Sequence, residues 1–249
     1  MVRRPVVARG RIEARATTGR RVHLPWRWYV SAHTLVIELP ERYQVLSWAP
    51  MGGGFRRASV ILNQQVALDD SGAAESPRTY LCRQAQLLGF LPQRTVAMMT
   101  GANIARGALA TMRRGSLTVS AWCSAGLSNA LRVGDSATAL SGHLGTINIA
   151  VAISRPATTA ALAEALQIAV EARVIAIQQA GLASTRSGLP ATGTGTDCIV
   201  VAAPDTSTKE PASLIGYCGK HTEAGELIGR AVLKSCSVAV NHCQGSVSL

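Results

Sequence analysis

Three residues in the C-terminal third of the chain have side chains that could move a proton. Asp197 ends the stretch ATGTGTD directly before an apolar run, His221 precedes an expected helix, and Glu226 falls in its first turn. A carboxylate beside an apolar run is a candidate general base. A histidine at a helix N-terminus is kept neutral and can serve as an acid or a base.

Each of these three residues also has a simpler interpretation. Asp197 can be a loop carboxylate that accepts hydrogen bonds from nearby N–H groups, His221 a surface histidine, and Glu226 a carboxylate favoured by the helix dipole. His221 and Glu226 are five positions apart, so they do not share a helical face unless the chain bends at Thr222.

A second set of residues is small, mostly neutral and polar, and flanks the apolar runs. If those runs are strands of one sheet, several clusters meet at one edge, where open α/β sheets bind ligands. Neutral hydroxyls and amides suit a ligand with many amide groups better than a polyanion, although each cluster alone is also ordinary turn chemistry. The predicted substrate-binding residues are Gly52, Gly53, Asn63, Thr100, Asn103, Ser124, Asn129, Thr146, Asn148, Thr192, Gly193, Thr194, Thr196 and Tyr217.

The familiar nucleotide, hydrolase and metal motifs are missing from the sequence. The Gly/Thr stretch precedes an apolar run instead of following one and has no lysine, which excludes a P-loop, and G-x-G-x-x-G after a strand is absent. G-x-S-x-G and H-E-x-x-H are absent too. The five histidines are scattered and the six cysteines form no C-x-x-C, so we predict no metal site and no cofactor.

The elements that must position these residues follow from the hydrophobic pattern. Strands are expected at 27–39, 43–48 and 58–68, then at 94–100, 116–125, 145–153 and 198–203, with a short helix at 77–90. A helix at 159–180 is apolar on several faces and therefore buried, and a last helix spans about 222–240. We predict an α+β or mixed α/β fold, a single layered domain with a mixed sheet and buried C-terminal helices.

Charge and composition suggest how the chain is organised. Seven arginines and one glutamate give residues 1–22 a charge of +6, out of +11 for the whole chain. We interpret 1–22 as a basic, flexible tail and 23–249 as one domain. Nucleic-acid binding would rest on that tail alone, and we expect none. No run of residues predicts a signal peptide or a membrane span, so we expect a cytoplasmic protein; the oligomeric state is not predicted.

Several segments together resemble one known family. SWAPMGGGF with ILN at 61–63, TGAN, SAGLSNALRVGD, GTINIAV, ATGTGTDCIVVA and Y-x-G-K-H-T-x-x-G-E-L-I-G-R-A-V are similar, in this order, to the adenosylcobinamide amidohydrolase (CbiZ) family. The resemblance covers about residues 45 to 240. It implies hydrolysis of the amide that joins aminopropanol to the corrin ring, giving adenosylcobyric acid for cobalamin salvage, with adenosylpseudocobalamin as a further substrate of some members.

The resemblance implies a small-molecule corrinoid partner and places cobalt within the substrate only. Amide hydrolysis needs an activated nucleophile, an oxyanion stabiliser and a proton for the leaving amine. Our hypothesis is direct attack by water, with Asp197 or Glu226 as base, His221 as acid and backbone N–H groups of 192–196 at the oxyanion. A threonine or cysteine nucleophile is the alternative chemistry, and a non-catalytic corrinoid-binding or carrier protein is the alternative function.

Overall fold

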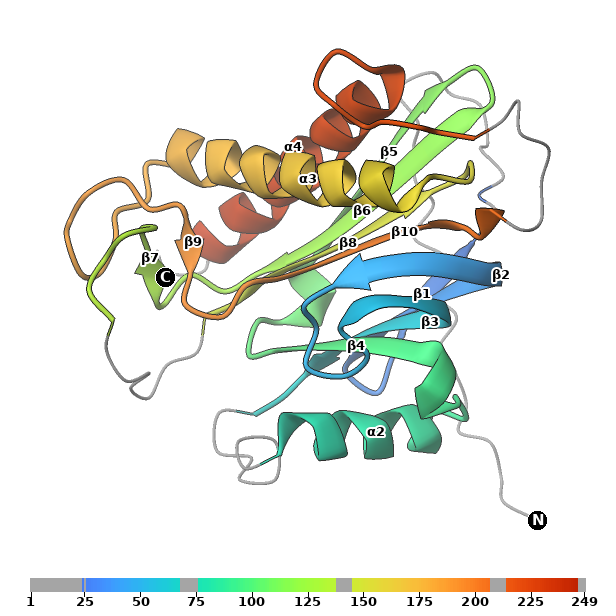
Figure 1. Ribbon diagram of the computed structural model, residues 1–249. Coiled ribbons are helices and arrows are strands. Elements are labelled where there is room, and N and C mark those ends of the chain that lie inside the picture. The colour runs from blue at the N-terminus through green and yellow to red at the C-terminus, as the bar shows by residue number, and fades with distance from the viewer. Residues whose placement is uncertain (1–23, 25, 68–75, 138–144, 207–213, 246–249) are drawn as a thin grey trace.

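A computed structural model describes residues 24, 26–67, 76–137, 145–206 and 214–245 (Figure 1). Their main feature is an eight-stranded mixed sheet with the order β4-β3-β2-β10-β8-β6-β5, in which β1 pairs with β2. The strands are β1 (Arg27–Ser31), β2 (Thr34–Ser47), β3 (Gly54–Gln65), β4 (Thr95–Thr100), β5 (Ala108–Arg114), β6 (Leu117–Ala125), β8 (Ile147–Ile153) and β10 (Cys198–Pro204).

The sheet is parallel at two places only, where β3 pairs with β4 and where β8 pairs with β10. Every other pairing within it is antiparallel. The sequence pattern predicts most of these strands but not β5, nor the two-stranded ribbon of β7 (Ala130–Leu131) and β9 (Gly193–Thr194). The predicted mixed sheet in a layered α/β fold is confirmed.

The first predicted strand, 27–39, is wrong as one element. The chain reverses at Ala32 and His33, whose φ angles are 46° and 61°, so β1 and β2 form a hairpin. A tight turn with two left-handed residues matches the twist of the flanking strands. β2 then runs on to Ser47, and its pairing with β3 is irregular between Glu38 and Tyr43, where bulges bend a strand.

The sheet curls so that strands distant in its order approach each other across the inside. The side chain of Asn148 on β8 donates to the carbonyl of Met99 on β4 at 2.9 Å, and Asn63 on β3 donates to Ser124 on β6 at 3.0 Å. Most of the remaining interior is apolar and includes Trp26 and Trp122. The curl therefore brings polar residues of β3, β6 and β8 together near one end of the sheet.

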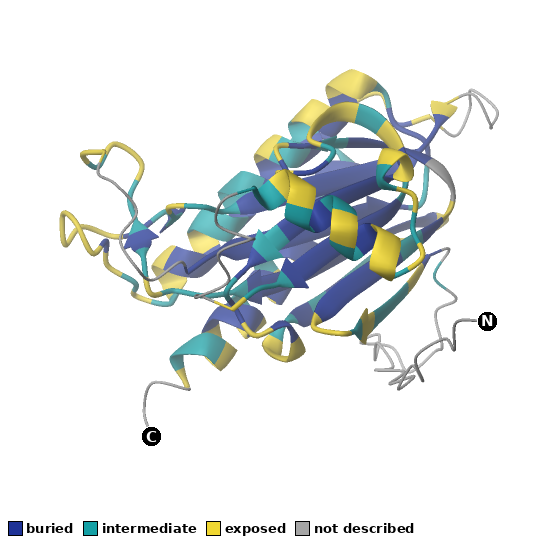
Figure 2. Cartoon of the chain, turned by 90° about the horizontal axis from the view of Figure 1, so that it is seen from below, coloured by how far each residue is buried: buried dark blue, intermediate teal, exposed yellow. Residues whose placement is uncertain are grey.

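Two long helices cover the outer face of β5, β6, β8 and β10: α3 (Thr159–Gln179) and α4 (Glu223–Gln244) (Figure 1). Thr158 and Thr222 cap them, each accepting a hydrogen bond from a backbone N–H three residues on, as expected of N-cap threonines. The predicted buried C-terminal helices are confirmed, and Figure 2 shows that the strands of the sheet are largely buried.

A shorter helix, α2 (Pro77–Leu87), packs on the outer side of β3 and β4 through Leu81 and Ala85. Two single 3-10 turns, η1 (Pro92–Arg94) and η2 (Ile104–Arg106), flank β4. None of the helices in the described part of the chain is long and apolar enough to cross a membrane. The basic segment 1–22 lies outside the described residues, so its predicted flexibility stays a prediction.

Candidate functional site

Asp197 stands at the end of the sheet where β8 and β10 begin and β6 ends. Cys198 pairs with Asn148 and Ala125 pairs with Ile147, so the three strand ends lie side by side. We call this region, with the loop 192–197 and the turn after β2, the Asp197 end of the sheet. It gathers the small polar residues that the sequence pattern places at strand ends.

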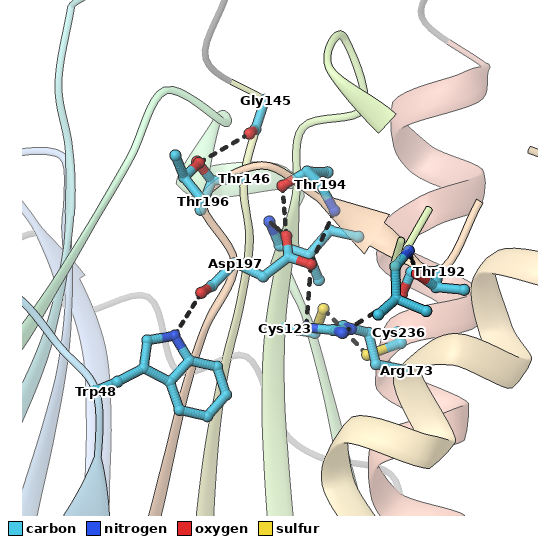
Figure 3. Close-up of polar contacts among 12 residues, drawn as sticks. Trp48, Cys123, Gly145, Thr146, Arg173, Thr192, Thr194, Thr196, Asp197 and Cys236 are labelled. Atoms are coloured by element: carbon cyan, nitrogen blue, oxygen red, sulfur yellow. Dashed lines mark hydrogen bonds and ion pairs between the residues drawn. The ribbon is translucent and has the colours of Figure 1, made fainter. Parts of the chain in front are cut away.

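The carboxylate of Asp197 is enclosed by four donors (Figure 3). The backbone N–H groups of Ile147 and Thr194 donate to it at 2.9 Å each, the hydroxyl of Thr194 donates to Oδ1, and Nη1 of Arg173 lies 3.0 Å from Oδ2. A carboxylate has about four acceptor positions. The side chain is 6% exposed and ties the loop to β8 and α3, as its simpler interpretation predicts; its role as a base stays a prediction.

Arg173 is a member of this site that the sequence pattern did not identify. It is the only arginine or lysine of α3, its side chain is 12% exposed, and its Nη2 donates to the carbonyl of Thr192 at 3.3 Å. A single cation inside an apolar helix was the available signal, because a buried charge is retained only when it is paired.

The loop that carries Asp197 is bound to its neighbours by hydroxyls and backbone groups. Thr196 and Thr146 share a hydrogen bond of 2.7 Å, and Thr196 also donates to the carbonyl of Gly145. Thr192 donates its N–H to Leu131. The N–H groups of Thr192 and Thr194 donate within the chain, and the oxyanion role predicted for the N–H groups of 192–196 stays a prediction. Gly195 is at the exposed tip of the loop.

Trp48, directly after β2, lies against the same loop and was also not identified from the sequence. Its indole N–H donates to the carbonyl oxygen of Asp197 at 2.6 Å, yet its side chain is 45% exposed. The signal was present in the segment SWAPMGGGF, where a tryptophan precedes a glycine-rich turn.

Inside the curl, one residue further into the strands, lies a chain of buried side-chain amides. Asn148 donates to Asn63 at 2.8 Å, and Asn63 donates to Ser124 at 3.0 Å; all three are 0% exposed. Oδ1 of Asn148 and both polar side-chain atoms of Asn129 are buried without a partner among the described residues. Such atoms are rare in folded proteins and call for an explanation.

Other residues predicted to bind substrate are engaged in local structure. Thr100 accepts from the N–H of Ala102 and Asn103 from that of Ala105, each within its own turn. A Cβ on Gly52 or Gly53 would lie 2.6 Å from a backbone carbonyl, and one on Gly193 would lie 2.3 Å from Asp197. These contacts explain why glycine stands there without a ligand, and substrate binding by these residues stays a prediction.

The other two predicted catalytic residues do not lie at the Asp197 end. The Glu226 carboxylate is bonded by Arg114 at 2.8 Å and Arg230 at 3.2 Å. Arg114 ends β5, whereas the Asp197 end corresponds to its start at Ala108. Six residues of strand span about 20 Å. The two candidate bases, Asp197 and Glu226, therefore lie at opposite ends of the sheet, and the catalytic roles of Asp197, His221 and Glu226 stay predictions.

His221 and Tyr217 belong to the Glu226 end of the sheet, which we define as the N-termini of α3 and α4 with Arg114. His221 is exposed and Tyr217 is 68% exposed, in a segment fixed by Glu164, which accepts from the N–H of Cys218. The hydrogen bonds from Arg114, and then those from Arg230, hold the pKa of Glu226 below its ordinary value.

The cysteines of the site do not have the character of nucleophiles. Burial raises the pKa of Cys198 to about 12, and the pKa of Cys123 also lies well above its ordinary value through burial and its contact with Cys236. A nucleophilic cysteine needs a thiolate. Among the described residues, no group of three or more His, Cys, Asp or Glu side chains could hold a metal ion.

With this geometry in place, similarity to known proteins identifies the family. The chain belongs to the adenosylcobinamide amidohydrolase family, whose model matches residues 17–247. The match is longer than the 45–240 suggested by the motifs, and it takes in β1, most of β2 and part of the basic segment. An uncharacterized protein of Methanocaldococcus jannaschii, MJ1613, is 29% identical over 221 residues, covering 81% of this chain and 83% of that protein.

Two solved structures show a loose likeness of fold. The L-aminopeptidase D-Ala-esterase/amidase of Ochrobactrum anthropi, described as a variant of the Ntn hydrolase fold, has a TM-score of 0.41 at 11% identity over 89% of this chain and 83% of that one. The PH0078 protein of Pyrococcus horikoshii has a TM-score of 0.40 at 10% identity over 84% and 76%. Neither likeness bears on the chemistry of this chain.

Proposed function

We propose that this protein hydrolyses the amide bond between aminopropanol and the corrin ring of adenosylcobinamide, giving adenosylcobyric acid for cobalamin salvage. The observation that carries the proposal is the family match over residues 17–247. We propose that the reaction takes place in the cytoplasm, where thiols stay reduced. We propose no resident cofactor, since the cobalt enters with the substrate, and complete cobamides such as adenosylpseudocobalamin are further candidate substrates.

The reaction is proposed to occur at the Asp197 end of the sheet. The partnerless buried amide atoms of Asn129 and Asn148 and the hydroxyls of the loop 192–197 supply both donors and acceptors. A corrinoid is fringed with neutral amides that pair with such groups. The Glu226 end instead presents an exposed carboxylate between two arginines, which suits an acidic or basic ligand better.

Asp197 is the proposed general base. Of its four donors, the Thr194 hydroxyl is the one that a side-chain rotation releases, because the two N–H groups belong to the backbone and Arg173 is buried. A water molecule in place of that hydroxyl gives its proton to Asp197 while its oxygen attacks the amide carbon. The carbon–nitrogen bond then breaks, and the leaving nitrogen receives the proton from Asp197. The N–H of Gly195 is proposed to stabilise the oxyanion.

The alternative nucleophile is Thr194 itself. Its hydroxyl donates to Asp197, which is in turn paired with Arg173, and a nucleophile, a base and an orienting group in sequence are what covalent catalysis requires. Thr194→Val separates the two chemistries, since attack by water survives this change and attack by Thr194 does not. Thr194→Ser is the matched control, because it keeps a hydroxyl at the same position.

The function itself is tested with purified protein and adenosylcobinamide, following the release of aminopropanol by mass spectrometry. We expect one molecule of aminopropanol for each molecule of adenosylcobinamide consumed, and many turnovers for each molecule of protein. A change in the corrinoid absorption spectrum without any product would instead support the carrier alternative. Loss of turnover in Asp197→Asn, with the protein still folded, would support the proposed site.

A further inference from the structure

We propose that Trp48 supplies an aromatic face on which the ring system of the corrinoid substrate rests. This inference depends on the proposed function for the identity of its ligand. It gives a binding role to a residue outside the predicted set of site residues, and it concerns substrate affinity rather than the chemical step.

The first observation is that the indole is exposed but held. Its N–H is its only polar group, and it donates at 2.6 Å to the carbonyl of Asp197 (Figure 3). What faces solvent is therefore apolar ring surface, with 45% of the residue exposed. Trp26 and Trp122 are each 4% exposed, as core tryptophans are. An aromatic ring fixed in place loses little conformational entropy when a ligand binds to it.

The second observation is that part of the neighbouring turn is exposed. Gly53 and Gly54 are exposed, and a Cβ added to Gly54 would meet no atom within 4 Å. Phe55 is 49% exposed and pairs with Leu46, two residues before Trp48. Two exposed aromatic residues thus stand at the two ends of a turn that contains two exposed glycines.

The third observation is the position of Trp48 relative to the polar groups. Its hydrogen bond joins it to the loop that carries Thr194, Thr196 and Asp197. A corrinoid has a large ring with apolar faces and amide groups around its edge. The indole face can therefore contact the ring system of the substrate, while the hydroxyls and the proposed base reach the amide at its edge that is hydrolysed.

A substrate-binding role and a purely structural role for Trp48 predict different effects of the substitution Trp48→Phe. Trp48→Phe keeps an aromatic face and loses the N–H that bonds the loop, whereas Trp48→Ala loses both. If the ring binds substrate, phenylalanine restores most of the function. If the hydrogen bond to Asp197 is what matters, the two variants are equally impaired.

The experiment combines steady-state hydrolysis of adenosylcobinamide with equilibrium dialysis of adenosylcobyric acid, which retains the ring and lacks the linker. For Trp48→Ala we expect KM to rise about tenfold or more, with kcat within about threefold, and the affinity for adenosylcobyric acid to fall in parallel. Trp48→Phe should stay within about threefold of the wild type in both. Ile175→Ala is the matched control, because Ile175 on α3 is also 45% exposed.

The possible failures are distinguishable. Suppose that the wild type hydrolyses the substrate, but Trp48→Ala has an unchanged KM or Trp48→Phe is as impaired as Trp48→Ala. The binding role of the Trp48 ring is then overturned, and the proposed function stands. If the wild type binds adenosylcobyric acid through Trp48 but releases no aminopropanol, hydrolysis is overturned and the aromatic face stands. If the wild type neither binds nor hydrolyses a corrinoid, both are overturned.

Discussion

The two ends of the sheet hold their acidic side chains in opposite ways. At one end, Asp197 is 6% exposed and bonded by two backbone N–H groups, a hydroxyl and a buried arginine. At the other, Glu226 is 36% exposed and bridged by two arginines that are themselves more than half exposed. Burial makes the first set of contacts specific, while solvent screens the second.

This difference shows where a precise site can be built. The Asp197 end combines fixed backbone donors, buried amides and an anchored aromatic ring, all supported by regular strands. The Glu226 end presents exposed side chains on a helix terminus, held to one another by solvent-exposed ion pairs. Sites that hold a substrate in one geometry need supporting contacts around each functional group, and only the Asp197 end has them among the described residues.

The largest effect is expected when Asp197 is removed. Asp197→Ala leaves the buried Arg173 without its counter-charge and two backbone N–H groups without their acceptor, so the free energy of unfolding should fall by about 3–5 kcal/mol. Urea denaturation measures this. In a double-mutant cycle with Arg173→Met, removing both residues should cost clearly less than the sum of the single changes. Simple additivity would show that the pair is not coupled.

A smaller effect is expected from the amide chain inside the curl. Asn63→Ala removes the acceptor of Asn148 and the donor to Ser124, and each buried group left unpaired costs about 1–3 kcal/mol. Thermal and urea unfolding should show the loss. Asn103→Ala is the control, because its exposed side chain caps a single turn. Equal stability of the two variants would contradict a buried network at this end.

One buried thiol at each end of the sheet, Cys198 and Cys218, allows a matched comparison in alkaline solution. Burial raises the pKa of both Cys198 and Cys218 to about 12 from 9.0. The folded state then holds a proton that the unfolded state loses, so the stabilisation is complete below pH 9 and is lost as the pH rises toward 12.

Each of these thiols should therefore cost about 1 kcal/mol between pH 9 and pH 10, because the unfolded thiol is already half ionised at pH 9. Cys198→Ala and Cys218→Ala should each reduce the fall in stability measured by urea unfolding at the two pH values. Hydrolysis by Cys198→Ala should stay within a few-fold of the wild type. A steep loss of activity in this variant would restore the thiol mechanism.

The smallest effects are expected at the Glu226 end. Glu226→Gln and His221→Ala change exposed groups, so the thermal midpoint and the turnover of adenosylcobinamide should both change little. Because hydrogen bonds from the arginines lower the pKa of Glu226, its contribution to stability is present above its unfolded pKa and is lost in acid as the pH falls through its folded value. A midpoint difference between Glu226→Gln and wild type that persists at pH 2 would contradict this.

Much of the fold follows from patterns that are local in the sequence. The apolar helix of 159–179 with its capping Thr158 and the largely apolar runs of β6, β8 and β10 are each specified within about twenty residues. β5 was missed because its sequence, ALATMRR, alternates weakly and ends in two arginines. The hairpin at Ala32 and His33 was missed because its turn contains neither the Gly nor the Asn that is typical of tight hairpins.

The site was predictable only where its members end strands. Asp197, Thr146 and Asn148 were placed together because strand ends meet at one edge of a sheet. Arg173 and Trp48 reach the site from a helix and from a turn, through contacts that join positions 24 and 149 residues apart along the chain. His221 and Glu226 were assigned from the chemistry of their side chains alone. Only the course of β5 and α4 in the structure shows that both residues are distant from Asp197.

The most direct test of the account is the rate of aminopropanol release from adenosylcobinamide by Asp197→Asn, measured beside Glu226→Gln and His221→Ala at equal concentrations of folded protein. The account predicts a loss of at least about a hundredfold in kcat for Asp197→Asn, as for removal of a general base, and rates near the wild type for the other two. Loss of turnover in Glu226→Gln or His221→Ala, with Asp197→Asn active, would move the site to the opposite end of the sheet.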